Sequence, residues 1–103
     1  MNDVIARWTT PAITYKPSAV NIADVDEIYL IIRQHGSEKI RKSKADAVID
    51  TNGFTWVLEQ TETARLKAFD EILVKIDYTS GTARYTTMPR KYTITESGIN
   101  EVI

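Results

Sequence analysis

The sequence predicts an all-β fold: a sandwich of about seven short antiparallel strands. Apolar and polar residues alternate in several short runs, as at Phe54, Trp56 and Leu58, and this period is that of a strand with one buried face. Turn residues separate these runs at intervals of roughly 8–12 residues. A single short helical turn, near residues 61–66, interrupts them. The pattern is typical of an immunoglobulin-like antiparallel β-sandwich, although the Cys…Trp…Cys hallmark of antibody domains is absent.

The chain has 103 residues, enough for one domain with its own hydrophobic core. We expect residues 11–95 to form this single β-sandwich domain. Residues 1–10 show no clear period and are expected to be a flexible N-terminal segment, and residues 96–103 are expected to be a C-terminal tail.

The first half of the domain contains an edge strand and a central strand. Pro11 and Pro17 bracket a short run in which Ile13 and Tyr15 share a face, and proline favours a sheet edge. A short strand is also expected over Ala19–Ile22. In Glu27–Gln34 both faces are substantially apolar, because Ile28, Leu30 and Ile32 share one face while Tyr29, Ile31 and Arg33 share the other. This run is therefore predicted to be a central strand covered on both sides.

The second half continues as hairpins. His35-Gly36-Ser37 is predicted to turn the chain into a charged strand over residues 38–44, and a short strand at residues 47–49 follows. Residues 50–53 (Asp50-Thr-Asn-Gly53) are predicted to be a turn, in which Asn52-Gly53 is a strong hairpin signal. Thr61 is expected to cap the helical turn. The later strands are expected at residues 54–59, 71–78, 82–87 and 90–95, with Met88-Pro89 as an interruption.

The strand face that must be buried also predicts how the strands at 71–78 and 82–87 pair. A loop of two or four residues between them places Ile76 opposite Tyr85 and Asp77 opposite Arg84. A three-residue loop would turn the apolar face of Ile76 toward Arg84. We therefore expect the even-numbered loop.

Composition excludes several classes of function. With 13 basic and 14 acidic residues the net charge is -1, so no overall field attracts nucleic acid or an anionic membrane. The absence of cysteine removes thiolate catalysis, cysteine-based zinc sites and disulfides. No apolar run has the roughly 18–20 residues needed to cross a bilayer, and the first residues do not resemble a signal peptide.

The titratable residues offer no recognisable catalytic or metal site. His35 is the only histidine, it lies in a Gly-Ser turn, and it is interpreted as a surface residue. The acidic segments at residues 24–27 and 50–53 lack the spacing of a calcium loop. We therefore predict no catalytic residues, no metal, no cofactor and no small-molecule substrate.

The basic cluster is interpreted as a solvated hairpin. Its cations, Lys39, Arg41, Lys42 and Lys44, divide between the two faces of a strand and have no aromatic stacking platform among them. Such charges also protect a strand against edge-to-edge aggregation.

The candidate functional residues are aromatic and aliphatic side chains, because such residues are enriched at the centres of protein interfaces. The same residue types also fill sandwich cores, so some of them are expected inside. The candidate interface residues are Trp8, Tyr15, Tyr29, Ile31, Tyr85 and Tyr92.

Three segments carry a resemblance to a known family. They are Asp26–Gln34 with the turn that ends in Asn52-Gly53, the run from Trp56 to Lys67, and the Ser80-Gly81 turn followed by the terminal Glu101-Val102-Ile103. Over residues 20–103 the chain resembles the immunoglobulin-like N-terminal domain of phage baseplate upper proteins and small stand-alone virion proteins from prophages of Gram-positive bacteria.

This resemblance implies a non-enzymatic structural protein of a phage tail, baseplate or capsid-associated assembly. Its expected partners are other phage structural proteins or further copies of itself, without nucleic acid or membrane. The expected location is the virion, after synthesis as a soluble protein in the host cytoplasm. The alternative is a carbohydrate- or cell-surface-binding β-sandwich module, in which exposed tyrosine and tryptophan rings would stack on sugars.

Overall fold

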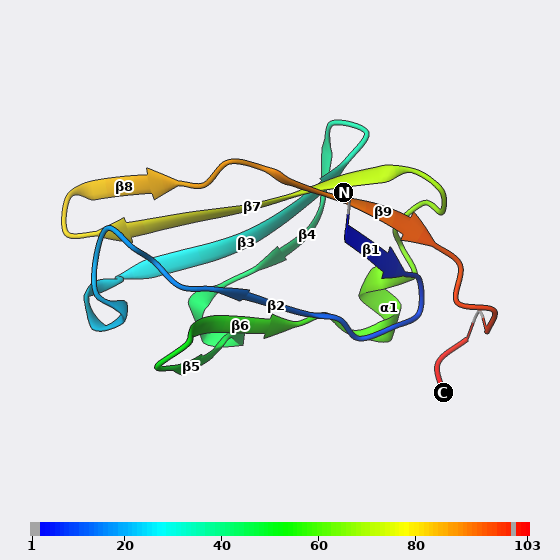
Figure 1. The fold of residues 1–103 in the computed structure, drawn as a ribbon, viewed down its shortest axis with the longest axis horizontal. Coiled ribbons are helices and arrows are strands. Elements are labelled where there is room, and N and C mark those ends of the chain that lie inside the picture. The colour runs from blue at the N-terminus through cyan, green and yellow to red at the C-terminus, as the bar shows by residue number, and fades with distance from the viewer. Residues whose placement is uncertain (1–2, 100) are drawn as a thin grey trace.

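The computed structural model describes residues 3–99 and 101–103. Within this part of the chain, nine strands form two sheets packed face to face, which confirms the predicted all-β sandwich (Figure 1). The strands are β1 (Asp3–Ala6), β2 (Ala12–Tyr15), β3 (Glu27–Gln34), β4 (Ser37–Lys42), β5 (Val48–Asp50), β6 (Gly53–Val57), β7 (Glu71–Ser80), β8 (Ala83–Thr86) and β9 (Arg90–Thr95). Short helical turns are η1 (Ile22–Asp24), η2 (Lys44–Asp46) and α1 (Gln60–Thr63), and no described helix is long and apolar enough to cross a membrane.

The six-stranded sheet has the order β1-β9-β7-β3-β4. The strand β8 also pairs with β7: β9 pairs with the first part of β7, residues 71–74, and β8 pairs with its last part, residues 77–80. The predicted interruption at Met88-Pro89 is confirmed, since β8 ends at Thr86 and β9 begins at Arg90. Proline has no N–H to donate, so the pairing with β7 stops there and resumes beyond it. The central position predicted for β3 is also confirmed, because β3 lies between β7 and β4. Of its two faces only the inner one is buried within this chain, since Tyr29 and Ile31 on the outer face stay half-exposed.

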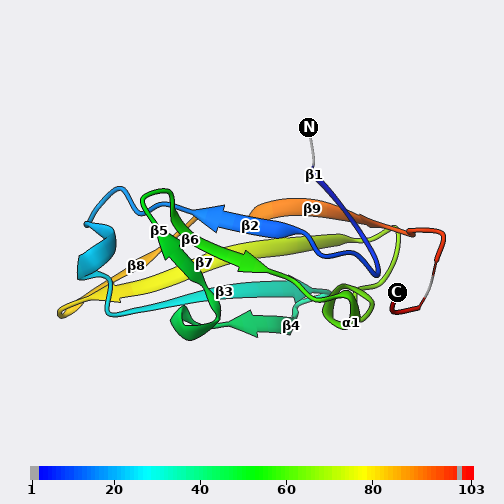
Figure 2. The same cartoon turned by 90° about the horizontal axis from the view of Figure 1, so that it is seen from below.

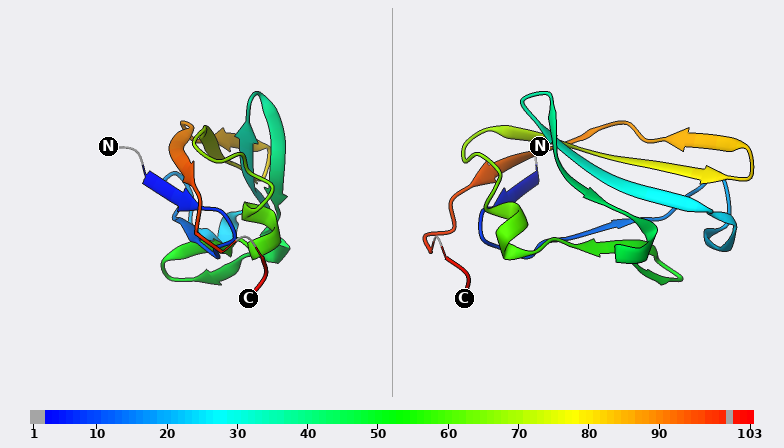
Figure 3. Two further views of the ribbon diagram at one scale, coloured as in Figure 1. Left: turned by 90° about the vertical axis from the view of Figure 1, so that its right-hand side faces the viewer. Right: turned by 180° about the vertical axis from the view of Figure 1, so that it is seen from behind.

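The three-stranded sheet has the order β2-β6-β5 and lies across the inner face of the larger sheet (Figures 2 and 3). As predicted, the strand bracketed by prolines is at an edge. The order β2-β6-β5 matches that of strands B, E and D in immunoglobulin domains. The order β9-β7-β3-β4 in the larger sheet matches that of strands G, F, C and C′ in the opposite immunoglobulin sheet. The fold is thus immunoglobulin-like, and its one parallel pair among the described strands joins β1 to β9.

Alternate residues of the strands form the core between the sheets. Ile28, Leu30 and Ile32 of β3 are fully buried, and Ile72, Val74 and Ile76 of β7 face the same way. From the three-stranded sheet, Phe54 and Trp56 stack with ring centroids 6.2 Å apart. The remaining buried apolar residues are Ile5, Ile13, Val25, Ile40, Leu58, Leu66, Tyr78 and Ile94.

The hairpin loops confirm one prediction and correct another. The predicted turn Asp50–Gly53 is confirmed, because Asp50 pairs with Gly53 and Thr51-Asn52 form the loop between them. The β7–β8 loop has an even number of residues and the buried face is as expected, yet the pairing is shifted by two residues. Tyr85 therefore lies opposite Tyr78, and not opposite Ile76. Sequence alternation determines which side chains of a strand face the core. A shift of the pairing by two residues keeps those side chains on the same face, so the exact register is set by the turn.

The N-terminal segment is more ordered than the sequence suggested. Residues 1–10 were expected to be a flexible segment, but Asp3–Ala6 form β1, whose Ile5 is buried opposite Ile94 of β9. A four-residue strand gives almost no periodic signal, and it forms because β9 offers a free edge. Met1 and Asn2 lie outside the described residues. Within residues 96–99 and 101–103 the predicted C-terminal tail contains no strand or helix.

Two local predictions between the strands are wrong. The expected strand over Ala19–Ile22 does not form, and the chain turns there into η1. The helical turn α1 exists, but its N-cap is Glu59 rather than Thr61. The Glu59 N–H donates to Glu62 Oε1 at 2.9 Å, which is the side-chain half of a capping box two residues before the expected position.

Candidate interaction surface

The outer face of the six-stranded sheet carries an apolar strip at its centre. Tyr29 and Ile31 of β3 point away from the core, in contrast to their buried neighbours Ile28, Leu30 and Ile32, and both are half-buried. Their partial burial comes from the central position of β3, because side chains of β4 and β7 flank them on both sides. We call this pair the Tyr29–Ile31 strip.

Charged side chains surround the Tyr29–Ile31 strip. Ile31 lies opposite Arg41 of β4 on one side and Lys75 of β7 on the other, and Tyr29 lies opposite Asp77. Tyr29, Ile31, Arg41 and Asp77 line a shallow surface hollow of about 270 Å³ together with Arg84 of β8. An apolar centre with a charged rim is the anatomy of a protein–protein interface.

Arg41 covers the ring of Tyr29. Its guanidinium carbon lies 5.9 Å from the ring centroid, within the range of a cation–π contact. Glu38 accepts hydrogen bonds from Arg41 Nη2 at 2.7 Å and Nε at 3.2 Å, and this carboxylate raises the pKa of Arg41. The guanidinium is therefore oriented before any partner arrives, with its charge already partly compensated.

Asp77 is the most enclosed charged group of this face, with only 14% of its side chain exposed. The Thr86 hydroxyl donates to Asp77 Oδ1, Arg84 Nη2 lies 3.6 Å from Oδ2, and Lys75 Nζ lies 3.8 Å from Oδ1. These neighbours satisfy the carboxylate. It has a structural role in fixing Arg84 and Lys75 around the strip.

The six candidate interface residues do not form one surface. Only Tyr29 and Ile31 lie on the outer face of the six-stranded sheet. Three others point inward and pack against the core: Tyr15, Tyr85 and Tyr92. They belong to β2, β8 and β9, the strands along one long side of the sandwich. Sequence alternation placed each of the six residues except Trp8 on a strand face, but it did not reveal which of these faces turns toward the core.

The inward tyrosines form a contact chain. The ring centroids of Tyr78 and Tyr85 are 4.9 Å apart with nearly parallel planes, and those of Tyr15 and Tyr78 are 5.9 Å apart. Burial, followed by the hydrogen bond with Tyr78, raises the pKa of Tyr15 to about 12. On the same side, Arg90 lies 5.5 Å from the ring centroid of Tyr92.

Trp8 lies in the connection from β1 to β2, where it is half-buried and has a positive φ of 63°. Its neighbour Thr9 is fixed by Thr63, whose hydroxyl donates to the Thr9 carbonyl at 2.9 Å and accepts from the Thr9 N–H at 3.1 Å. Trp8 Nε1 is buried and has no hydrogen-bond acceptor among the described residues. The residue packs against its own domain, apart from the Tyr29–Ile31 strip.

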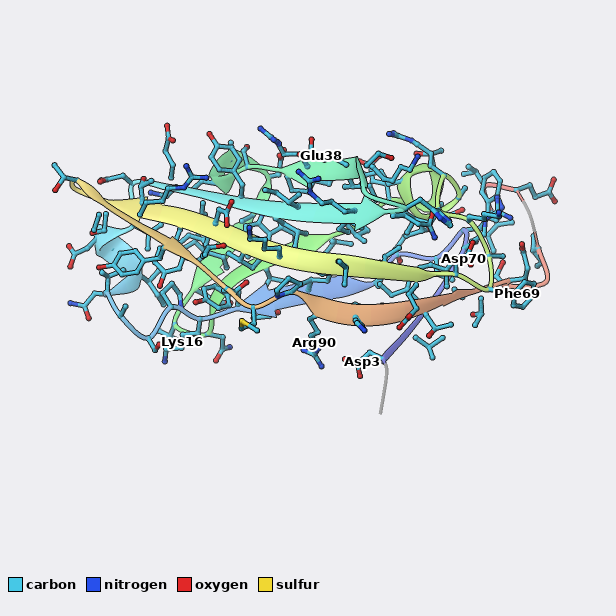
Figure 4. The ribbon with its side chains drawn as sticks, turned by 90° about the horizontal axis from the view of Figure 1, so that it is seen from above. Asp3, Lys16, Glu38, Phe69, Asp70 and Arg90 are labelled. Carbon is cyan, nitrogen blue, oxygen red and sulfur yellow. The ribbon has the colours of Figure 1, made fainter. Side chains whose placement is uncertain are left out.

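One exposed aromatic residue, Phe69, is not among the candidates that the sequence predicted. Phe69, in the loop before β7, is 76% exposed and has a positive φ of 64°, and Figure 4 shows it with Asp70 at one end of the molecule. Nearby, His35 Nε2 lies 3.0 Å from Asp70 Oδ2, so the predicted surface turn is at the same end. No strand period marks Phe69, and a loop residue leaves no other sequence signal.

Three of the four cations of the predicted basic hairpin are engaged separately. Arg41 binds Glu38, Lys42 Nζ lies 2.8 Å from Glu62 Oε1, and Lys44 Nζ donates to the Val25 carbonyl at 2.8 Å. They therefore do not form a continuous basic surface. Among the residues that the structure describes, no group of three or more His, Asp or Glu side chains could hold a metal ion.

The tyrosine and tryptophan rings bear on the choice between a protein partner and a sugar. Each of the tyrosine and tryptophan rings among the described residues is buried or half-buried, and the guanidinium of Arg41 lies over the ring of Tyr29. No protein-family model, curated protein or solved structure gives a significant match to this chain, so its assignment to the immunoglobulin-like sandwich stands on the strand order alone.

Proposed function

We propose that this chain is a non-enzymatic structural protein that acts by protein–protein assembly in a phage or prophage particle. The observation that carries the assembly role is the Tyr29–Ile31 strip, a half-buried apolar centre within a rim of paired charges. Tyrosine and arginine are the residue types that most often contribute strongly to binding at such centres. The virion setting rests on the resemblance of residues 20–103 to baseplate and prophage proteins.

The mechanism is the burial of a pre-organised face. Arg41 is held by Glu38, and Arg84 and Lys75 are held near Asp77, so few side chains must be ordered when a partner docks. Lower ordering cost leaves more of the contact energy as affinity. A partner is expected to supply an apolar group over Ile31 and carboxylates for the exposed ends of the arginines.

The test is co-purification of the chain with each protein encoded by its neighbouring genes. Ile31→Asp places a charge at the centre of the strip and is expected to abolish co-purification. Val57→Asp is the matched control, because Val57 is an exposed β-strand valine on the outer face of the other sheet. Capture that survives Ile31→Asp, or is lost equally with Val57→Asp, contradicts the proposed surface.

A further inference from the structure

The three-stranded sheet has an open position beside β2. In constant-type immunoglobulin domains the corresponding sheet has four strands, with strand A at the edge next to strand B. Here the first strand, β1, pairs with β9 in the other sheet, so the edge of β2 has no neighbour among the described strands (Figure 2). An unpaired strand edge of this kind is a template for another strand.

The register shows which backbone groups of β2 face outward. The Leu58 N–H donates to the Pro11 carbonyl, so the backbone of residue 11 points toward β6. Successive residues of an antiparallel strand point alternately to the two sides. Ile13 and Tyr15 therefore bond to β6, whereas Ala12, Thr14 and Lys16 direct their N–H and C=O groups to the open edge.

This free edge is complementary to itself. We propose that two copies of the chain pair antiparallel through β2, with the two-fold axis at Thr14, which extends the proposed assembly function to a defined strand edge. Thr14 then faces Thr14 of the second copy, and Ala12 faces Lys16. Ile13 faces Tyr15, so that apolar residues on the core side of each sheet meet in register.

The two prolines fit this symmetry. Pro11 and Pro17 are equally distant from Thr14 along the chain. Pro11 lies at a position whose backbone faces β6, so it removes no donor from the open edge. The prolines therefore limit the length of the pairing segment and leave its centre available.

The charges also favour a second copy. Lys16 is the one charged residue between the two prolines, and the pairing places it beside Ala12 of the other copy, away from the other Lys16. Arg90 on the same long side is paired with Asp3, and Figure 4 shows Lys16, Arg90 and Asp3 along this side. No uncompensated like charges meet at the axis.

An apolar surface lies next to the same edge. A hollow of about 210 Å³ beside β2 is lined by Ile13, Tyr15 and Tyr92 together with Met88, which is 87% exposed. Pairing through β2 brings the second copy against this side and covers Met88. Two of the six candidate interface residues, Tyr15 and Tyr92, thereby gain a position at the border of an interface.

The experiment measures self-association of the full chain by sedimentation and light scattering. The wild type is expected to be a dimer that dissociates on dilution. Thr14→Glu and Thr14→Lys each place like charges opposite one another at the axis and are expected to weaken the dimer at least about tenfold. An equimolar mixture of these two variants is expected to restore a dimer, since a carboxylate then faces an ammonium group.

Thr14→Val is the matched control. It removes the hydroxyl that contacts Thr55 Oγ1 at 2.9 Å but adds no charge, so the dimer is expected to persist. Equal far-ultraviolet circular dichroism of all variants verifies folding. A monomeric wild type, dimers formed by both charged variants, or a mixture that stays monomeric overturns the proposal. Ile31→Asp is expected to leave this dimer intact, so failure of the Tyr29–Ile31 strip and failure of the β2 pairing are distinguishable.

Discussion

Gln34 holds both backbone groups of Lys67. Its Nε2 donates to the Lys67 carbonyl at 3.0 Å, and the Lys67 N–H donates to its Oε1 at 2.7 Å. The side chain is 2% exposed, so this pair fastens the loop before β7 to the end of β3 in a setting that water does not reach.

Replacing Gln34 with methionine should lower the free energy of unfolding by about 2 kcal/mol, because two backbone groups lose their partner in a buried setting. Gln60 provides the matched control, since it makes the same two bonds to the backbone of Ile103 at an exposed site, at 3.2 and 3.0 Å. Gln60→Met should cost less than about 0.5 kcal/mol. Urea unfolding of both variants measures the difference, and equal losses would refute the assigned role of burial.

Gly53→Ala should destabilise the fold by about 3 kcal/mol or more. Gly53 has a φ of 110°, and a Cβ there would lie 2.3 Å from the Tyr15 carbonyl oxygen of the neighbouring strand β2. Gly36→Ala is the control, because Gly36 also has a positive φ but no atom within 4 Å of an added Cβ. Its expected cost is about 1 kcal/mol. A similar thermal midpoint for the two variants would contradict the close approach.

The two tryptophans should respond differently to replacement by phenylalanine. Trp56 is fully buried and its Nε1 donates to the Ser43 carbonyl at 2.9 Å, so Trp56→Phe loses a bond and core volume and should cost about 2–3 kcal/mol. Trp8→Phe removes a buried donor that has no acceptor among the described residues, and should cost less than about 1 kcal/mol. Chemical denaturation of the pair tests this, and a larger loss at Trp8 would be evidence against its assigned environment.

Tyr15 should make the protein less stable in strong alkali. Burial raises its pKa to about 12, while the unfolded chain loses the same proton near the ordinary value of 10. The folded state therefore binds more protons than the unfolded state between these values, so the free energy of unfolding falls as pH rises from about 10 to 12. Tyr15→Phe should flatten this decline. An unchanged slope, measured by denaturation at a series of pH values, would assign the decline to other groups.

The sequence predicted the parts of the fold that depend on alternation. β3 and β7 are long enough for the two-residue period to identify the inner face, and Pro11 and Pro17 indicated an edge strand. The β7–β8 register and the cap of α1 were misplaced because each depends on a local turn that alternation does not specify. β1 was missed because its pairing with β9 is a long-range contact that a four-residue segment does not encode.

The candidate surface was only partly accessible to sequence reasoning. Tyr29 and Ile31 were identified because both faces of β3 are apolar. The rim was not predicted, since Arg41, Asp77 and Arg84 come from three other strands and meet only after pairing. Phe69 gave no signal because it belongs to a loop.

The central claim, that this chain is a structural component of a phage particle, is tested most directly by quantitative mass spectrometry of particles purified after prophage induction in the source strain. The account predicts that the chain bands with the particles in a density gradient, at a constant ratio to the tail or capsid proteins across the fractions. Intact particles that lack the chain, with the chain recovered elsewhere in the lysate, would contradict it.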